Sequence, residues 1–378
     1  MEITELLVTS LAGKPIYYYP LNAIGDAELA SKCMLVTGVV LTTEDLVSVK
    51  SKEITTIFYK NANRMILSVK IKNLKIKVQT IQKTLLKLIN DQIVSTITLS
   101  QIDMIFDREP GYDLRNQLSG TEQLITGLIE SYDFPFYEAI KVENLAEKVK
   151  LAKAMEEVFS NKGIIFGILL TEKMKVTALA TNRSYELHIN DFNILLMLLK
   201  NSRNNLGETW LPICLPNSVD ENAFVQAHIS TIENNGYLIL VSNLYTETDF
   251  HLVSALKDNF SKRMVLKTDV NSELGIFTEY EDLLSLTVVL NTTLPKQQMT
   301  FHRFKDKRFE EIYSNLRAGK EDSKVIQMHS CIGVCKKDSR LEIYGIFCGF
   351  TKTEDYCKFI LDAENMARNN SLKYAMIA

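Results

Sequence analysis

The sequence predicts an α+β fold built from antiparallel sheets that helices pack against on one side. Three observations support this prediction. The chain has 378 residues, of which 46% are hydrophobic, so it can form roughly two or three domains that each bury a core. Strand-like and helical segments alternate, and their order recurs three times along the chain. Gly and Pro number only 15 and 7, and no linker rich in Pro, Gly or Ser divides the chain.

The first third begins with a predicted hairpin, in which strand-like residues 3–12 and 13–20 meet at a turn containing Gly13. Asp26 is expected to cap a helix over residues 27–41. Strands are predicted at 55–60 and 64–72, followed by a long helix and by a shorter one that Ser100 opens with Asp103. The long helix is indicated by apolar residues spaced three or four apart, namely Val78, Ile81, Leu85 and Leu88.

The middle third repeats this order. A hairpin is predicted over residues 163–170 and 173–180, and paired strands at 223–231 and 237–242. Asn190 is expected to cap one helix and Thr246 another. The helix that opens this third is predicted from the apolar stripe Leu145, Val149, Ala152 and Phe159.

The last third is shorter. Strands are predicted at residues 283–290, within 324–335 and at 341–350. Two further helices are indicated by apolar stripes, one of Phe309, Ile312 and Leu316 and one of Phe359, Ala363 and Met366.

Residues 113–130, DLRNQLSGTEQLITGLIE, raise the question of a phosphate-binding loop. Such a loop needs several Gly residues followed by Lys and then Ser or Thr, which this stretch lacks. We interpret Ser119 and Glu122 instead as a capping box at the start of an amphipathic helix. The Ser119 oxygen would accept from the amide of Glu122, whose carboxylate would reach back to the amide of Ser119.

The sequence contains no catalytic signature of the kind G-x-S-x-G or H-E-x-x-H and no P-loop. The only tight group of potential metal ligands is His329, Cys331 and Cys335, which Cys348 and Cys357 could in principle complete. Because zinc favours two close pairs of ligands and the second pair is missing, we interpret the group as buried strand residues. No cofactor or metal is therefore expected. The scattered Cys residues fit a reducing compartment.

The net charge is -3, which disfavours a general nucleic-acid-binding protein. One local basic run has two interpretations. We favour a solvated strand face whose lysines block edge pairing over a surface for an anionic membrane or an acidic partner. The run comprises Lys50, Lys52, Lys60, Arg64, Lys70, Lys72, Lys75 and Lys77.

Trp210, the only Trp, lies in the segment ETWLPICLP, where Pro212 and Pro216 indicate an edge strand or an extended loop. It either anchors a partner or closes a domain core, and the sequence leaves both readings open. No apolar run approaches the roughly 20 residues of a membrane helix, and the N-terminus shows no secretory signal. A cytoplasmic protein is expected.

Several segments together resemble the Mon/SAND family of vacuolar fusion proteins. Residues 113–129 resemble the first hallmark of the family, and 208–216 with the following AFVQAHIS is similar to the second. The hairpin segment TSLAGKPIYYY and the runs 95–115, 162–180 and 240–257 match in the same order. The motif residues, whose roles the resemblance leaves unresolved, are Gly13, Lys14, Pro15, Asp113, Leu114, Arg115, Gly120, Thr121, Glu122, Trp210, Pro212 and Pro216.

The resemblance implies three longin-type domains, expected at residues 1–130, 131–266 and 267–378. It also implies a Ccz-type tri-longin partner. In the family, the two proteins form a guanine-nucleotide exchange factor for the late-endosomal and vacuolar Rab GTPase of the seventh class, recruited peripherally to that membrane in endosome maturation, vacuole fusion and autophagy. The first longin domains pair to form the GTPase platform there. We therefore expect the working surface on helix 27–41 and the adjoining strands, with Glu28 and Lys32 as candidate GTPase-facing residues.

Two departures from the family qualify these expectations. Members usually carry a long acidic N-terminal extension, so any regulation placed there is expected to be absent. The segment NSVDENAF, residues 217–224, replaces a family segment of the type K-F-N, which puts the contact of that lysine in doubt. Alternatives are a non-catalytic longin scaffold or adaptor, a subunit of another tri-longin Rab exchanger and, more remotely, a metal-dependent or hydrolytic enzyme.

Overall fold

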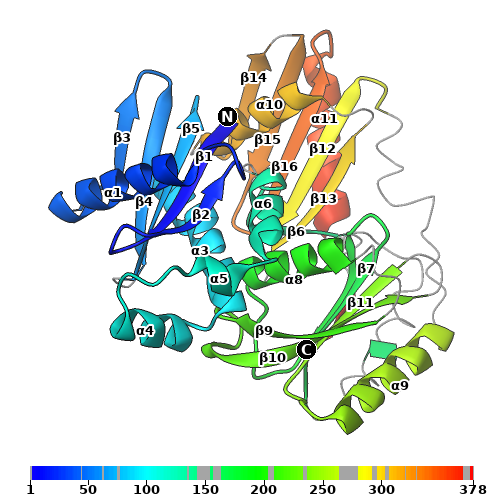
Figure 1. The fold of residues 1–378 in the computed structure, drawn as a ribbon. Helices are drawn as coiled ribbons and strands as arrows, with labels where there is room; N and C mark the ends of the chain where they lie inside the picture. The colour runs from blue at the N-terminus through cyan, green and yellow to red at the C-terminus, as the bar shows by residue number, and fades with distance from the viewer. Residues whose placement is uncertain are drawn as a thin grey trace. The chain divides into compact units, whose positions relative to one another are not determined.

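The computed structural model shows three sheets flanked by helices (Figure 1). It describes residues 2–43, 45–61, 64–74, 77–133, 136–142, 154–155, 163–202, 208–232, 236–263, 280–291, 296–302, 306–319, 321–328, 330–368 and 375–377. The helix predicted from Leu145, Val149, Ala152 and Phe159 therefore lies almost entirely outside the described residues.

The first sheet has five antiparallel strands in the order β2-β1-β5-β4-β3. These strands are β1 (Glu2–Ser10), β2 (Pro15–Tyr19), β3 (Ser48–Ser51), β4 (Ile54–Asn61) and β5 (Met65–Lys72). The predicted hairpin is confirmed, because β1 pairs with β2 and Gly13 takes a φ of 75° at the turn. A positive φ is costly for residues with a Cβ atom, which explains Gly at this position.

Six helical segments complete this part of the chain: α1 (Asp26–Thr42), α2 (Val78–Ile81), α3 (Lys87–Thr96), α4 (Leu99–Arg108), α5 (Arg115–Leu118) and α6 (Glu122–Glu130). A π-helical stretch at Gln82–Leu86 joins α2 to α3, so the predicted long helix is confirmed with a local irregularity. Helix α1 packs against β1, β2 and β5, whereas the π-helical stretch packs against β4 and β5.

The predicted helix caps are mostly wrong in detail. Helix α1 begins at Asp26 itself, with Gly25 at the N-cap and no side-chain capping bond. Helix α4 is capped by Thr98, whose hydroxyl accepts from the amide of Gln101, rather than by Ser100. Thr246 is a true cap, since its hydroxyl accepts from the amide of Asp249 at 3.3 Å. Candidate capping residues cluster near helix starts, and which of them bonds depends on contacts made elsewhere.

The second sheet has the order β17-β8-β7-β11-β10-β9. Its strands are β7 (Ile164–Thr171), β8 (Val176–Thr181), β9 (Thr209–Leu215), β10 (Asp220–Ile232), β11 (Gly236–Ser242) and β17 (Ala375–Ile377), which pairs with β8 in parallel. Two helices, α8 (Ile189–Ser202) and α9 (Glu247–Arg263), belong to the same stretch of chain. Both predicted strand pairs, β7 with β8 and β10 with β11, are confirmed.

The third sheet has the order β14-β15-β16-β12-β13-β6. Its strands are β6 (Ala139–Lys141), β12 (Leu283–Leu290), β13 (Lys296–His302), β14 (Ser323–Met328), β15 (Cys331–Lys337) and β16 (Leu341–Cys348). Helices α10 (Lys307–Ala318) and α11 (Thr353–Arg368) cover opposite faces. A Cβ atom on Gly333 would meet Ile312 of α10, whereas one on Gly345 would meet Phe359 of α11.

The predicted α+β class is confirmed. The chain forms two compact units: unit 1 comprises residues 1–132, 190–201 and 213–224, and unit 2 comprises residues 133–189, 202–212 and 225–378. Unit 1 thus contains the first sheet together with two later segments of the chain. The domain boundaries at 130 and 266 stay predictions. Among the described residues, no helix is both long enough and apolar enough to cross a bilayer.

Candidate functional site

Helix α1 has one buried stripe and one exposed apolar stripe. Leu29, Cys33 and Thr37, spaced four residues apart, are buried, and the first two pack with Leu7 of β1. We name the exposed stripe the α1 face. It consists of Met34, Leu35, Val39 and Leu41, whose exposed fractions are 62%, 67%, 36% and 49%. A group of large apolar side chains left in water on one helix is typical of a protein-binding surface.

Strand β3, which follows α1 in the chain, adds to the exposed apolar area of this unit. It is one of the two edge strands of the first sheet and pairs only with β4 among the described strands. Val49 on β3 and Val47 just before it are 47% and 37% exposed. An edge strand offers unpaired backbone groups to a partner, so a helix face and a sheet edge are both available in this unit.

The predicted GTPase-facing residues Glu28 and Lys32 have different environments. Glu28 is exposed, as expected for a surface contact. Lys32 is half-buried instead: its ammonium group donates to Glu5 at 2.9 Å and to the Tyr18 hydroxyl at 3.2 Å. Lys32 also lies 3.6 Å from Glu28. The role of both residues towards a GTPase stays a prediction.

Glu5 is the centre of the polar contacts beneath α1. Its carboxylate accepts from Lys32 and pairs with Lys70 at 2.7 Å, while the Tyr18 hydroxyl donates to it at 3.2 Å. Burial opposes ionisation, but hydrogen bonds to the two ammonium groups hold the pKa of Glu5 below its ordinary value. The bond to Glu5 in turn raises the pKa of Lys32. These contacts fix α1 to the sheet through β1, β2 and β5.

The first hallmark supports the N-terminal end of α1. Arg115 donates to both carboxylate oxygens of Asp113, with its closest contact at 2.7 Å, and to Asp26 at 3.2 Å. The guanidinium group of Arg115 holds the pKa of Asp113 below its ordinary value. Leu114 between them is fully buried. Asp113 and Arg115 therefore tie the hallmark to the first residue of α1.

The glycine of the first hairpin lets the β1–β2 turn approach α1. A Cβ atom on Gly13 would lie 2.5 Å from the sulfur of Met34, closer than van der Waals contact allows. Lys14 is exposed at this turn, and Pro15 is buried. The turn motif is thus explained by packing against the same helix that carries the α1 face.

The capping box predicted for Ser119 and Glu122 is wrong in detail. Thr121 occupies the N-cap of α6 without a side-chain capping bond, and its hydroxyl donates to the carbonyl of Leu118 at 2.7 Å. The Glu122 carboxylate accepts from the amide of Gly120 at 2.8 Å rather than from that of Ser119. Gly120 has a φ of 89°, a backbone conformation that favours glycine, just before the helix.

Residues 208–216 of the second hallmark include β9, an edge strand of the second sheet, as the two prolines predict, and AFVQAHIS lies on β10. Pro212 is exposed within the strand, and Pro216 follows it. Trp210 packs against the core of unit 2, with its ring 5.0 Å from that of Phe250 and its Nε1 donating to Gln226. The structure therefore provides a core-packing role for Trp210, and its role towards a partner stays a prediction.

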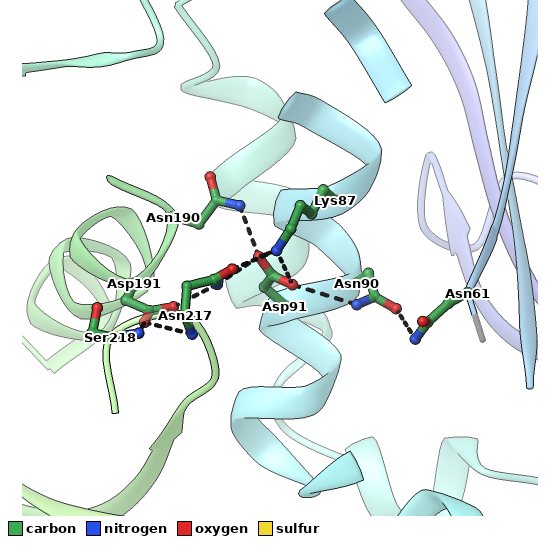
Figure 2. A network of polar contacts seen from close by, with 8 residues as sticks. All are labelled: Asn61, Lys87, Asn90, Asp91, Asn190, Asp191, Asn217 and Ser218. Carbon is green, nitrogen blue, oxygen red and sulfur yellow. Dashed lines mark hydrogen bonds and ion pairs between the residues drawn. The ribbon is translucent and has the colours of Figure 1, made fainter. Parts of the chain in front are cut away.

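A buried polar network that the sequence did not predict follows the second hallmark (Figure 2). Asp91 of α3 is 2% exposed, and its carboxylate accepts from Lys87 at 2.9 Å, Asn190 at 2.7 Å and Asn217 at 2.8 Å. Lys87 also donates to the side-chain oxygen of Asn217. Asn190 lies in the first turn of α8 and binds Asp91 instead of capping the helix as predicted.

A second buried carboxylate extends this network. Asp191 is fully buried and accepts from the amides of Asn217 at 3.0 Å and Ser218 at 2.6 Å, and from the Asn217 side chain at 3.0 Å. Burial raises the pKa of Asp191, and these donors oppose the rise. All of these residues belong to unit 1. Asn217 and Ser218 are the first two residues of the segment that departs from the family. In this chain they bind the buried carboxylates of Asp91 and Asp191.

Three members of the basic run, Arg64, Lys70 and Lys72, are paired with carboxylates within unit 1. Arg64 binds Asp103 at 2.6 Å and Asp107 at 2.7 Å. Lys72 lies 3.7 Å from Glu53. Lys50 is exposed on edge strand β3, and both interpretations of the run, blocked edge pairing and a membrane or partner surface, stay predictions. Lys52, Lys60 and Lys77 are also described, whereas Lys75 lies outside the described residues.

The predicted packing role of the cysteine group holds for its described members. Cys331 and Cys335 are buried in the core beneath α10, and His329 lies outside the described residues. Across the described part of the chain, no three His, Cys, Asp or Glu side chains gather as metal ligands would.

Comparison with known proteins agrees with this geometry. Residues 4–128 match the first longin domain of FUZ, MON1 and HPS1, and residues 162–262 match the second longin domain of the same proteins. The fold and these matches define a longin-domain protein. The third sheet lies outside both matches.

Individual relatives identify the family. The chain is 31% identical over 275 residues to a protein named SAND from Takifugu rubripes, covering 70% of this chain and 51% of the relative. It is 30% identical over 274 residues to vacuolar fusion protein MON1 homolog A from Gallus gallus, covering 70% of this chain and 48% of the relative. The chain belongs to the Mon/SAND family. It spans about half the length of these relatives.

We expect Glu5→Gln to lower the free energy of unfolding by about 1–2 kcal/mol at pH 7, because Lys32 and Lys70 lose a charged acceptor. The folded-state pKa of Glu5 lies below the unfolded value of 4.5, so this stability is present above pH 4.5 and is lost as the pH falls through the folded pKa. Urea unfolding measured at pH 7 and at lower pH should therefore show that the difference in free energy of unfolding between wild type and variant becomes smaller as the pH falls. The control Glu53→Gln, whose lysine partner is 3.7 Å away and exposed, should change stability by less than about 0.5 kcal/mol. An equal effect of both substitutions would contradict the role of Glu5.

We expect Asp91→Ala to lower the free energy of unfolding by about 2–4 kcal/mol, because Lys87, Asn190 and Asn217 each lose one acceptor in a buried network. Amide hydrogen exchange should rise in residues 190–201 and 213–224. Asp107→Ala is a suitable control, since Asp107 is exposed and Arg64 keeps its bond to Asp103. Unchanged exchange in both segments would show that the network does not hold them.

Proposed function

We propose that the chain is one subunit of a heterodimeric guanine-nucleotide exchange factor for the late-endosomal and vacuolar class of Rab GTPase. The partner would be a Ccz-type tri-longin protein. The observation that carries the proposal is the α1 face, which leaves four large apolar side chains exposed in the first longin domain. The names of the relatives, which are vacuolar fusion proteins, support a role in vacuolar trafficking.

The partner surface in this proposal combines the α1 face with the edge of strand β3. The apolar side chains of the α1 face would form the dry centre of an interface, which is where most binding energy is concentrated. The edge strand would add backbone hydrogen bonds to a strand of the partner. Glu28, exposed on the same helix, would lie towards the GTPase, together with Lys32.

The mechanism needs no covalent chemistry. A protein that binds the nucleotide-free GTPase more tightly than the nucleotide-bound form must, by thermodynamic reciprocity, weaken nucleotide binding. Displacing a switch loop that contacts Mg²⁺ and phosphate would have this effect. The contribution of this chain would be half of the platform that holds the displaced loop, so the activity would appear only in the pair.

Cytoplasmic localisation with peripheral recruitment to the late endosome or vacuole belongs to the same proposal. The exposed lysines of the basic run, such as Lys50 and Lys52, would then lie towards an anionic membrane surface. A non-catalytic longin scaffold is the second candidate. The matched domain models also describe FUZ and HPS1, and a subunit of another tri-longin exchanger is the third candidate.

We expect Leu35→Arg to weaken association with the Ccz-type partner by about 30-fold or more, which corresponds to loss of one interface hot spot. Leu35 is 67% exposed, so the fold should not change. Titration calorimetry of the two purified proteins would measure the affinity. Leu361→Arg on α11, a side chain 58% exposed, is the matched control and should bind as wild type does. Wild-type affinity of the folded Leu35→Arg variant would exclude the α1 face as the partner surface.

Release of labelled GDP from a late-endosomal Rab, with this chain alone, the partner alone and the pair, tests the activity itself. Acceleration by the pair alone is expected.

The double variant Glu28→Ala, Lys32→Ala should lower the accelerated rate by about tenfold, a typical effect of losing one or two polar contacts. Lys70→Ala removes the other Glu5 partner without changing α1 and should retain the rate. Full exchange by the folded double variant would refute the placement of the GTPase, and pairing without acceleration on any Rab would favour the scaffold.

A further inference from the structure

Two free cysteines lie directly opposite one another on adjacent strands of the third sheet. Cys331, the first residue of β15, is the register partner of Cys348, the last residue of β16. Directly opposite residues of an antiparallel pair project to the same face of the sheet. The two thiols therefore lie side by side, although the cysteines are 17 positions apart in the sequence.

The backbone hydrogen bonds define which type of pair this is. The amide of Gly349 donates to the carbonyl of Ser330 at 2.8 Å, so the bond joins the residues that flank the two cysteines. Cys331 and Cys348 thus form a non-hydrogen-bonded pair, in which the Cα atoms of opposite residues approach to about 4.5 Å. A disulfide spans Cα separations of about 4.4–6.8 Å, so the backbone spacing typical of such a pair lies within the range that a disulfide can bridge.

The two thiols differ in access. Cys331 is 3% exposed and packs in the core beneath α10, and burial raises the pKa of its thiol. Cys348 is only partly buried, so a small oxidant in solvent reaches it first. Cys335 lies on the same strand face as Cys331 but opposite Tyr344, so the register gives it no cysteine partner.

We propose that Cys331 and Cys348 form a redox-active dithiol that peroxide converts reversibly into a disulfide. The thiolate of Cys348 attacks hydrogen peroxide, the O–O bond breaks, and the products are a sulfenic acid and hydroxide, which takes up the thiol proton to form water. The Cys331 sulfur then attacks the sulfenic sulfur and displaces its hydroxyl group, which leaves as a second water with the Cys331 proton. Two thiols are oxidised by two electrons in all, and one peroxide is reduced to two waters. Two molecules of glutathione, which leave as their disulfide, or the dithiol of thioredoxin reverse the reaction by thiol–disulfide exchange.

The bond would act on the turn that follows β16. The carbonyl of Cys348 accepts from the amide of Thr351 at 3.1 Å and from its hydroxyl at 2.8 Å, which shapes the turn carrying Phe350. Phe350 is 93% exposed. A disulfide would fix the start of this turn to β15, and it would do so whether or not the chain acts in nucleotide exchange.

Thiol counting on the full chain tests the proposal. After treatment with hydrogen peroxide and denaturation, alkylation should label four of the six cysteines, and dithiothreitol should restore all six. Peptide mapping without reduction should recover the Cys331–Cys348 cross-link in monomeric protein. Labelling of all six cysteines after peroxide, or a cross-link that omits either residue, would overturn the proposal.

Two variants sharpen this test. In Cys348→Ser, which changes a partly buried residue, no internal disulfide should form; in Cys357→Ser, which removes the exposed thiol on α11, the loss of two thiols should persist. Cys331→Ala provides the same readout from the other strand if the first variant is unstable. Loss of two thiols in folded Cys348→Ser would show that other cysteines carry the oxidation, and the assignment would then fail.

Discussion

Much of unit 1 depends on the need to satisfy one buried carboxylate. A charged group removed from water costs several kcal/mol unless donors surround it. Asp91 is 2% exposed, and its donors come from one turn earlier on α3, from the start of α8 and from the turn after β9. The last two lie 99 and 126 positions further along the chain. The Asp91 side chain therefore holds two distant segments, the start of α8 and the turn after β9, against α3. Asp191, also buried, binds the same turn through Asn217 and Ser218.

Helix α1 shows how the same unit combines stability with a surface for binding. Its buried stripe, the Glu5 contacts and the Arg115 bond to Asp26 hold the helix on the sheet from one side and one end. Because these contacts immobilise the helix, the helix backbone that carries the exposed apolar side chains loses little conformational entropy when a partner binds. A rigid, exposed apolar helix face, in a unit that also has an open sheet edge at β3, is the feature that a partner of similar fold would recognise.

The hallmark residues of the family have structural explanations in this chain. Gly13 allows a turn to approach Met34, Asp113 and Arg115 bind one another and the start of α1, and Gly120 adopts a positive φ before α6. Trp210 packs in the core of unit 2, and the residues after Pro216 satisfy the buried carboxylates. The motif residues thus stabilise the fold of the longin domains by their packing and hydrogen bonds.

The sequence by itself determined the α+β class, the hairpins and most helices, because alternation of apolar residues and helical spacing are local properties of the chain. Gly13 at its turn and Thr246 at its cap were predicted for the same reason, since each acts on its immediate neighbours. The tertiary structure decided what distant residues do to one another. Asp26, Ser100, Ser119 and Asn190 were expected to cap helices, yet long-range contacts or a neighbouring residue replaced those bonds. Lys32 was expected on the surface and instead binds Glu5, and the Asp91 network and the Cys331–Cys348 register join residues whose separation leaves no periodic signal. Such pairings follow from which elements meet in space, and a one-dimensional pattern does not contain that information.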